Sequence, residues 1–221
     1  MRPCATSCAV RDLDVCTFCA SLTSLEFVPN LAVTPITSQI HGCLFTNEDD
    51  LLAALAYHCK LNEVIVEIGS FHGRSTVALA FGSRAGANIP IYTFDDYSGG
   101  EAMEAVDAFG SLLQNLKNHK VDNLVIPAKL NSTEAARNFS LKVGLLFIDG
   151  NHSYESCKAD VVAWQDKVTS GGRIAFHDCM DPIRGSIRFI GPLQVIFEQF
   201  KDNNQYTIEG RCASIVVVRK A

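Results

Sequence analysis

Apolar and polar positions alternate along the chain in blocks that predict strands and helices in turn. Five short runs, rich in β-branched or aromatic residues, have the composition of buried strands: 64–68, 91–94, 124–127, 143–148 and 173–176. The segments between them repeat apolar positions at helical spacing, as in Tyr154, Cys157, Val161 and Trp164. Strands that alternate with amphipathic helices predict an α/β fold with a doubly wound, mostly parallel sheet.

Local signals mark the two ends of this alternating region. Thr46 and Asp49 fit a capping box at the start of a helix. Near the end of the chain, the runs 206–208 and 213–218 flank a Glu-Gly-Arg sequence at 209–211, which predicts a hairpin-like antiparallel pair. With these two strands the expected sheet has seven.

Residues 1–35 lack sustained periodicity, and we expect them to form a cysteine-rich extension that precedes a domain of residues 36–221. Four of the nine cysteines crowd this segment: Cys4, Cys8, Cys16 and Cys19. The last two have the spacing of a zinc clamp, but no second pair at that spacing follows. A zinc site and a thiol-bearing tail therefore both remain open.

Composition narrows the class of protein further. The 221 residues are 48% hydrophobic and 19% charged, which is typical of a globular chain and long enough for one sizeable core. A formal net charge of −5 argues against nucleic acid or an acidic membrane surface as a partner. Neither an apolar run of membrane-spanning length nor an apolar leader is evident, so we expect a cytoplasmic protein.

Polar residues stand where four of the predicted parallel strands end. They are Glu67, Asp95, Asp96, Asp149, His177 and Asp178. One acidic strand end would mean little, since loops are commonly acidic. Because open α/β sheets bind ligands outside the carboxyl ends of their strands, the recurrence predicts a ligand site at this edge.

The turn after the first strand limits which ligand fits. Gly69 and Gly73 allow close backbone approach, and the following helix offers free N–H groups. The middle glycine of a dinucleotide-binding turn is missing, and Glu67 before the turn would repel a diphosphate. Glu67 instead suits a cationic ligand with hydroxyl and amino groups, such as S-adenosylmethionine.

The sequence resembles the class I S-adenosylmethionine-dependent methyltransferases. It is similar in particular to small-molecule and sugar O-methyltransferases with the motif Phe-Ile-Asp-Gly-(Asp/Asn)-His-Ser-Tyr. Five stretches carry the resemblance: 67–76, 93–100, 131–132, 147–155 and 171–178. The resemblance implies a Rossmann-like methyltransferase fold over residues 36–221.

The resemblance also implies roles for single residues. Gly69, Ser70, Gly73 and Ser75 would hold the methionine part of the cofactor, and Asp95 would accept the ribose hydroxyls. Asp96 and Ser132 would lie near the adenine. The full set of cofactor-binding candidates is Glu67, Gly69, Ser70, Gly73, Ser75, Asp95, Asp96, Ser132 and Asp149.

Related O-methyltransferases place a divalent cation at positions that match Asp149, His177 and Asp178. Such an ion would orient the acceptor hydroxyl and lower its pKa. His177 departs from the all-oxygen ligands typical of magnesium, so the identity of the metal stays open, and a simple strand cap is the alternative. His152 is the candidate general base, because Asn151 replaces the aspartate of some relatives and cannot take a proton. The catalytic candidates are thus His152, Asp149 and His177.

The sequence therefore predicts O-methylation of a small hydroxylated acceptor, a sugar or a secondary metabolite, with a homo-oligomer as a possible assembly. An NAD-dependent oxidoreductase is the enzymatic rival, although the missing middle glycine and the terminal strand pair argue against it. A catalytically silent binding or assembly module that retains the fold is the alternative from another class.

Overall fold

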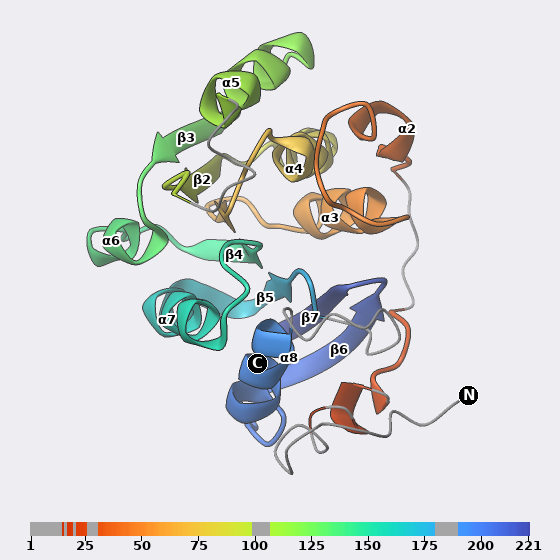
Figure 1. Cartoon of the computed structure of the whole chain (residues 1–221), viewed down its shortest axis with the longest axis vertical. Helices are drawn as coiled ribbons and strands as arrows, with labels where there is room; N and C mark the ends of the chain where they lie inside the picture. Colours follow the sequence, from red (N-terminus) through yellow and green to blue (C-terminus); the bar gives the residue numbers. More distant parts are fainter. Residues whose placement is uncertain (1–14, 16, 20, 26–30, 99–106, 180–189) are drawn as a thin grey trace.

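A computed structural model describes residues 15, 17–19, 21–25, 31–98, 107–179 and 190–221 (Figure 1). One sheet contains β1 Val64–Ile68, β2 Ile91–Asp95, β3 Val125–Lys129, β4 Val143–Ile148, β5 Val168–Phe176, β6 Tyr206–Cys212 and β7 Ile215–Lys220. The helices are α2 Thr34–Thr37, α3 Glu48–Tyr57, α4 Arg74–Ala85, α5 Ala108–Asn118, α6 Ser132–Arg137, α7 Tyr154–Trp164, the short η1 Gln165–Lys167 and α8 Ile190–Phe200. None of the helices in these ranges combines the length and apolar character that crossing a membrane requires.

The order of strands across the sheet is β3-β2-β1-β4-β5-β7-β6. Strands β1 to β5 pair in parallel, whereas β7 runs antiparallel to both β5 and β6. The predicted doubly wound sheet with an antiparallel C-terminal pair is therefore confirmed. The chain order reverses between the neighbours β1 and β4, and ligands bind at such a switch point in open α/β sheets.

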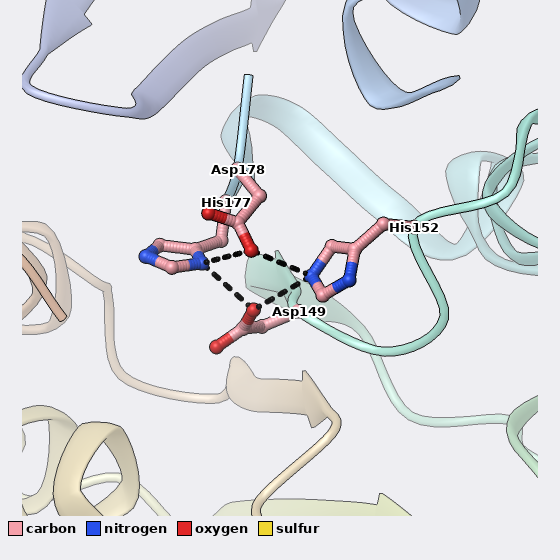
Figure 2. Close-up of side chains that lie close together, drawn as sticks. All are labelled: Asp149, His152, His177 and Asp178. Atoms are coloured by element: carbon pink, nitrogen blue, oxygen red, sulfur yellow. Dashed lines mark ion pairs between the residues drawn. The ribbon is translucent and has the colours of Figure 1, made fainter. Parts of the chain in front are cut away.

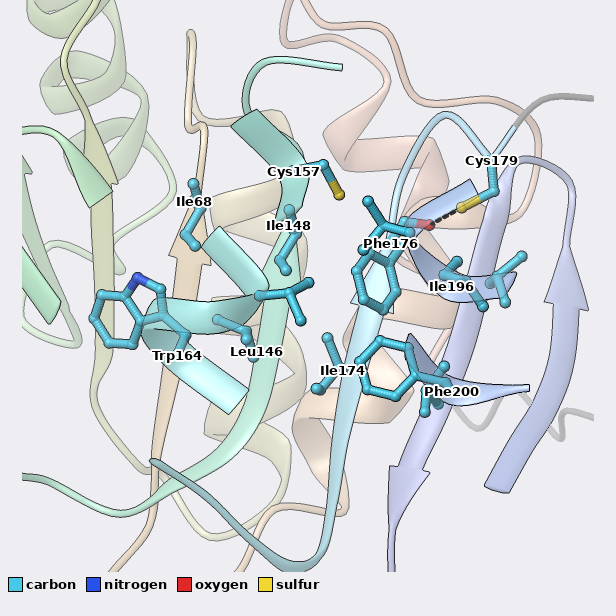
Figure 3. Packing of buried hydrophobic residues seen from close by; sticks show 14 of the residues in the cluster. Ile68, Leu146, Ile148, Cys157, Trp164, Ile174, Phe176, Cys179, Ile196 and Phe200 are labelled. Atoms are coloured by element: carbon cyan, nitrogen blue, oxygen red, sulfur yellow. Dashed lines mark hydrogen bonds between the residues drawn. The ribbon is translucent and has the colours of Figure 1, made fainter. Parts of the chain in front are cut away.

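Helices cover both faces of the sheet, α3, α4 and α5 on one side and α6, α7 and α8 on the other (Figure 1). Side chains of β4 alternate between the two cores: Leu146 and Ile148 face α7, while Leu145 and Phe147 face α3 and α4. Figure 3 shows the first of these cores, in which Trp164 packs beside Leu146. Both faces of the central strands are thus buried, which explains their unbroken apolar sequences.

Backbone pairing extends past the strands to the residues that follow them. The N–H groups of Gly69, Asp149 and His177 donate to carbonyls at the ends of β2, β1 and β4, over 2.9, 2.8 and 3.0 Å. Because these bonds extend the strand pairing by one residue, the side chains continue to alternate between the two faces of the sheet. Asp149 and His177 therefore take the face of Phe147 and Ala175, toward α3 and α4. The sheet itself brings the polar strand ends together.

Within residues 1–35, the described residues between 15 and 25 lie against the antiparallel end of the sheet, whereas Val33 and Thr34 bond to Asp50 of α3. Val15, Phe18 and Cys19 are buried, and the ring of Phe18 meets that of Phe197 on α8 at 5.5 Å. The backbone at 23–25 pairs with Arg211 of β6. Cys4, Cys8 and Cys16 lie outside the described residues. The boundary between residues 35 and 36 stays a prediction.

Two local predictions are wrong. Helix α3 starts at Glu48 and its N-cap is Asn47, with a left-handed φ of 72° and no side-chain cap, so Thr46 and Asp49 form no capping box. Asp49 instead pairs with Arg74 at 2.7 Å. At the C-terminus, β6 runs through 209–211 and turns only after Cys212. Gly210, with φ 136°, absorbs a break in register rather than a hairpin turn.

Candidate active site

The turn between β1 and α4 is held close to the end of β4. Gly69 and Gly73 have φ of 85° and 89°, a region that strains residues with a Cβ. A Cβ on Gly69 would also overlap the carbonyl oxygen of Asp149. The backbone conformation therefore favours glycine at both positions. At Gly69 the close contact between the ends of β1 and β4 also leaves no room for a side chain.

Glu67 lies at the base of this turn and is fully buried. Its two carboxylate oxygens accept hydrogen bonds of 2.6 Å from the hydroxyls of Ser75 and Thr76, in the first turn of α4. Burial raises the pKa of Glu67 to about 7, although the hydroxyl bonds oppose this rise. The carboxyl group thus links the start of α4 to β1, and the hydroxyl of Ser75 is occupied by this bond.

Asp95, at the end of β2, holds the loops around the turn. One oxygen accepts from the N–H groups of Ser70 and Phe71 at 2.9 and 3.0 Å, and the other from Tyr97 at 2.8 Å. The hydroxyls of Ser70 and Tyr97 lie 2.9 Å apart. Since an ionised carboxylate has about four acceptor positions, these three bonds leave Asp95 room for one more donor.

The two residues expected near adenine sit in different surroundings. Asp96 is exposed, and it accepts hydrogen bonds from the N–H and the hydroxyl of Ser98. Ser132 is buried, and its hydroxyl donates to Asp160 of α7. Burial raises the pKa of Asp160 to about 6. The sequence offered no local signal for the role of Asp160.

Four polar side chains converge beyond β4 and β5, as Figure 2 shows. Nδ1 of His177 lies 2.9 Å from Oδ1 of Asp149 and 3.5 Å from Oδ2 of Asp178. Nε2 of His152, from the loop before α7, lies 2.9 Å from the same Asp178 oxygen and 3.6 Å from Asp149. One atom of each residue falls within 4.8 Å of all the others. The sequence-predicted catalytic and metal candidates therefore form one cluster.

Opposite charges stabilise one another in this cluster. Burial alone would raise the pKa of Asp149 and of Asp178, but the two imidazoles hold both values below the usual range. Burial would lower the pKa of His152, but the two carboxylates raise it to about 9. The pKa of His177 is likewise raised well above its ordinary value, mainly by Asp149 against the cost of burial. At neutral pH both rings are thus protonated and both carboxyls are ionised.

Glu48 of α3 is a site residue that the sequence analysis missed. Its Oε2 lies 3.0 Å from Nε2 of His177, and both side chains are buried. An acidic residue in the first turn of a helix is normally explained by the helix dipole. No local pattern indicated that Glu48 would meet a strand end so far along the chain.

The donor set of the cluster fits a divalent cation. Nδ1 of His177 is buried and has no partner with hydrogen-bond geometry among the described residues, although two carboxylate oxygens lie close by. Two carboxylates and imidazole nitrogen are ligands that first-row divalent metals accept. Asp178 has a left-handed φ of 51°, which turns its side chain back toward the cluster. Backbone strain of this kind gathers at functional sites.

Comparison with protein families decides the class of protein. The family model described as "Methyltransferase domain" matches residues 66–179, more than half of the chain. The chain belongs to this methyltransferase family. The matched range contains the glycine turn and all four residues of the cluster, so the match covers the carboxyl ends of the strands from β1 to β5.

Solved structures share the fold of this methyltransferase domain at low sequence identity. The cofactor-bound Rv0187 protein from MTB is 16% identical, with a TM-score of 0.62 over 97% of this chain and 99% of that one. CalS11, a TDP-rhamnose 3'-O-methyltransferase of calicheamicin biosynthesis, is 16% identical, with a TM-score of 0.60 over 97% and 96%. A Staphylococcus aureus protein described as a candidate caffeoyl-CoA O-methyltransferase is 17% identical, with a TM-score of 0.59 over 83% and 87%.

The resemblance drawn from sequence is confirmed for the family and the fold. The structure brings Glu67, Gly69, Ser70, Gly73, Ser75 and Asp95 together around one turn, and Asp149, His152, His177 and Asp178 into one cluster beside it. Asp96 and Ser132 lie on the far side of Asp95, toward α6 and α7. The assignment of cofactor-binding, catalytic and metal roles among these residues stays a prediction.

Proposed function

We propose that this protein is an S-adenosylmethionine-dependent O-methyltransferase that acts on a small hydroxylated acceptor, such as a sugar or a secondary metabolite. The observation that carries the proposal is the cluster of Asp149, His152, His177 and Asp178 directly beside the glycine turn of a methyltransferase domain. The turn suits a cofactor without a diphosphate, because it lacks the middle glycine of a dinucleotide-binding turn. The cluster supplies groups that can bind and deprotonate a hydroxyl.

The cofactor would lie across the carboxyl edge, from the glycine turn to α6. Gly69, Ser70 and Gly73 would surround its methionine part, and the remaining acceptor position of Asp95 would take a ribose hydroxyl. Ser132 and Asp96 would line the adenine end. Glu67 and Ser75 would act from beneath the turn, because they bond to each other.

Asp149, His177 and Asp178 would hold a divalent cation. The ion would supply orientation and a lowered pKa to the acceptor hydroxyl. The imidazole of His177 favours manganese, iron, cobalt or zinc over the magnesium typical of all-oxygen sites. Asp149 and Asp178 also balance the charge of such an ion, as they balance the two imidazoles in this structure.

His152 would accept the proton of the acceptor hydroxyl. Its side chain is 28% exposed, more than any other member of the cluster, so an acceptor can reach it. With a pKa of about 9 beside two carboxylates, His152 carries a proton at neutral pH. A cation bound by Asp149 and Asp178 would cancel their effect and return His152 to the neutral form that a base needs.

The cytoplasm is the compartment we propose, because a reducing compartment preserves free thiols such as those of Cys59, Cys157 and Cys179.

Calorimetric titration of the full chain with S-adenosylmethionine and with NAD tests the proposed cofactor. We expect saturable binding of S-adenosylmethionine and none of NAD. Binding of NAD without S-adenosylmethionine would refute the proposal, and binding of neither would favour a module that retains only the fold.

A further inference from the structure

We infer that Glu48 is a positioning residue for the cation: it holds the Nε2 hydrogen of His177, so that Nδ1 is the ring nitrogen that binds the metal. The inference rests on the proposed function, because it presupposes a divalent cation at Asp149, His177 and Asp178. Glu48 belongs to α3 and lies outside residues 66–179, the range that the family model matches, so the inference adds a new residue to the site.

Every acceptor position of Glu48 is occupied in the structure. Oε1 accepts from the backbone N–H and the hydroxyl of Ser214, at 2.7 and 2.8 Å. Oε2 accepts from the backbone N–H of Phe45 at 2.7 Å and meets Nε2 of His177 at 3.0 Å. Glu48 is 0% exposed, so water does not compete for these positions. Three hydrogen bonds from Ser214 and Phe45 therefore fix the carboxylate independently of His177.

These contacts determine which nitrogen of His177 carries the hydrogen. A carboxylate can only accept, so the Nε2 that faces Glu48 is the donor. In neutral imidazole the other nitrogen then has the free lone pair, and Nδ1 points at Asp149 and Asp178. Metal-binding histidines commonly donate their second N–H to a carboxylate, which fixes the tautomer and the ring orientation. Glu48 stands in that position.

The fold explains why these residues meet. His177 continues the alternation of β5 and so faces α3, whose first residue is Glu48. The backbone N–H of Cys179 donates to the carbonyl of Ser214 at 2.9 Å, which places the turn between β6 and β7 beside the end of β5. Phe45 stacks near the His177 ring, with 6.4 Å between centroids. Two segments outside β5, residues 45–48 and the turn between β6 and β7, thus surround the end of β5 and hold the ring of His177 in one orientation.

Glutamine cannot replace Glu48 at this site. Each carboxylate oxygen faces one backbone N–H, from Phe45 or from Ser214, and a backbone N–H can only donate. Either orientation of a glutamine amide would therefore set an NH2 group against an N–H group. On the side of His177, that NH2 would donate to Nε2 and move the ring hydrogen to Nδ1, where it would block the metal.

The unaltered protein provides the first test. Zn²⁺ is added to the full-length, ¹⁵N-labelled chain, and long-range ¹H–¹⁵N correlation spectra are recorded, with His177→Asn identifying the signals of His177. We expect a metal-bound Nδ1 and a protonated Nε2 whose hydrogen exchanges slowly with water. Metal bound at Nε2, or a protonated Nδ1 in the loaded protein, would overturn the inference.

Variants provide the second test, through Mn²⁺ affinity measured by competition with a chelator. We expect Glu48→Gln to weaken Mn²⁺ binding about 10- to 100-fold, as removal of such supporting carboxylates typically does. Asp50→Asn is the matched control: Asp50 lies on the same helix and bonds to the backbone of Val33 and Thr34, away from the cluster. It should bind Mn²⁺ as the unaltered protein does.

The outcomes separate the inference from the proposed function. If the unaltered protein binds neither Mn²⁺ nor Zn²⁺, the proposed cation site is wrong and the inference falls with it. If the unaltered protein binds metal and Glu48→Gln binds it equally well, only the role of Glu48 is refuted. Should Glu48→Gln fail to fold, the spectra of the unaltered protein still decide.

Discussion

Glu48 and His177, 129 residues apart in the chain, are joined by a buried contact of 3.0 Å between Oε2 and Nε2. The contact links the start of α3 to the end of β5. On its other side, His177 meets Asp149 at 2.9 Å. The candidate active site thus lies at the end of the sheet, and α3, the helix before β1, supports it through Glu48.

Removal of metal should lower the stability of the protein. A ligand that binds only the folded state stabilises it by about 2.7 kcal/mol at one hundred times its dissociation constant. We therefore expect Mn²⁺ to raise the melting temperature and EDTA to reverse the rise, with a smaller effect of Mg²⁺ at equal concentration. Scanning calorimetry measures this shift. Asp178→Asn should abolish it, and a rise of equal size in that variant would place the metal elsewhere.

Glu67→Gln should change how stability depends on pH. The unfolded chain releases the Glu67 proton near pH 4, whereas the folded chain holds it until about pH 7. Between these values the folded state binds more protons, so burial of Glu67 lowers stability as pH rises. Relative to the unaltered protein, Glu67→Gln should gain on the order of 2–3 kcal/mol between pH 4.5 and pH 8.

Urea denaturation at the two pH values measures this difference. Glu134→Gln, at an exposed position of α6, is the control and should show no such gain. Equal pH dependence in Glu67→Gln and the unaltered protein would show that Glu67 is already ionised in the folded state at low pH.

Gly69→Ala should be more harmful than Gly171→Ala. Both glycines have positive φ, 85° and 79°, so alanine strains the backbone by about 1–2 kcal/mol at either position. At Gly171 the added Cβ meets only Lys60 Nζ at 3.6 Å, whereas at Gly69 it overlaps the Asp149 carbonyl. Gly69→Ala should therefore lower the free energy of unfolding by more than Gly171→Ala does, and it should also weaken S-adenosylmethionine binding. Equal losses in urea denaturation would mean that the contact between β1 and β4 relaxes freely.

Asp95→Asn should loosen the glycine turn. The carboxylate accepts three backbone N–H groups, and an amide in its place must turn an NH2 toward at least one of them. Lost hydrogen bonds to a charged group cost about 1.5–3 kcal/mol. We expect a loss of that order in urea denaturation, and less than about 1 kcal/mol for the neighbouring Asp96→Asn, whose side chain is exposed. Similar losses at both positions would contradict the bracing role of Asp95.

The sequence was most informative where local pattern and final environment agree. The strands at 64–68 and 143–148 match the structure at both ends, because strands buried on two faces have nearly unbroken apolar sequences. The convergence of Asp149 and His177 also followed from sequence, since parallel neighbours end at the same edge.

The parts that the sequence could not predict depend on contacts between distant segments. Glu48 had the appearance of a helix-terminus charge, and only the packing of α3 against β5 reveals its partner. The capping box at Thr46 failed for a related reason, because Asp49 is drawn to Arg74 of α4. At 209–211, pairing with β7 continued the strand through a glycine that locally favours a turn.

Transfer of label from methyl-labelled S-adenosylmethionine to the small molecules of a cell extract tests the central claim most directly. Mass spectrometry of the products compares the unaltered protein with His152→Ala at equal, calorimetrically verified cofactor saturation. The account predicts a labelled O-methyl product with the unaltered protein and a loss of turnover of about 10²- to 10⁴-fold in His152→Ala, the usual range for a general base. Undiminished labelling by His152→Ala, or no labelled small molecule with the unaltered protein, would contradict it.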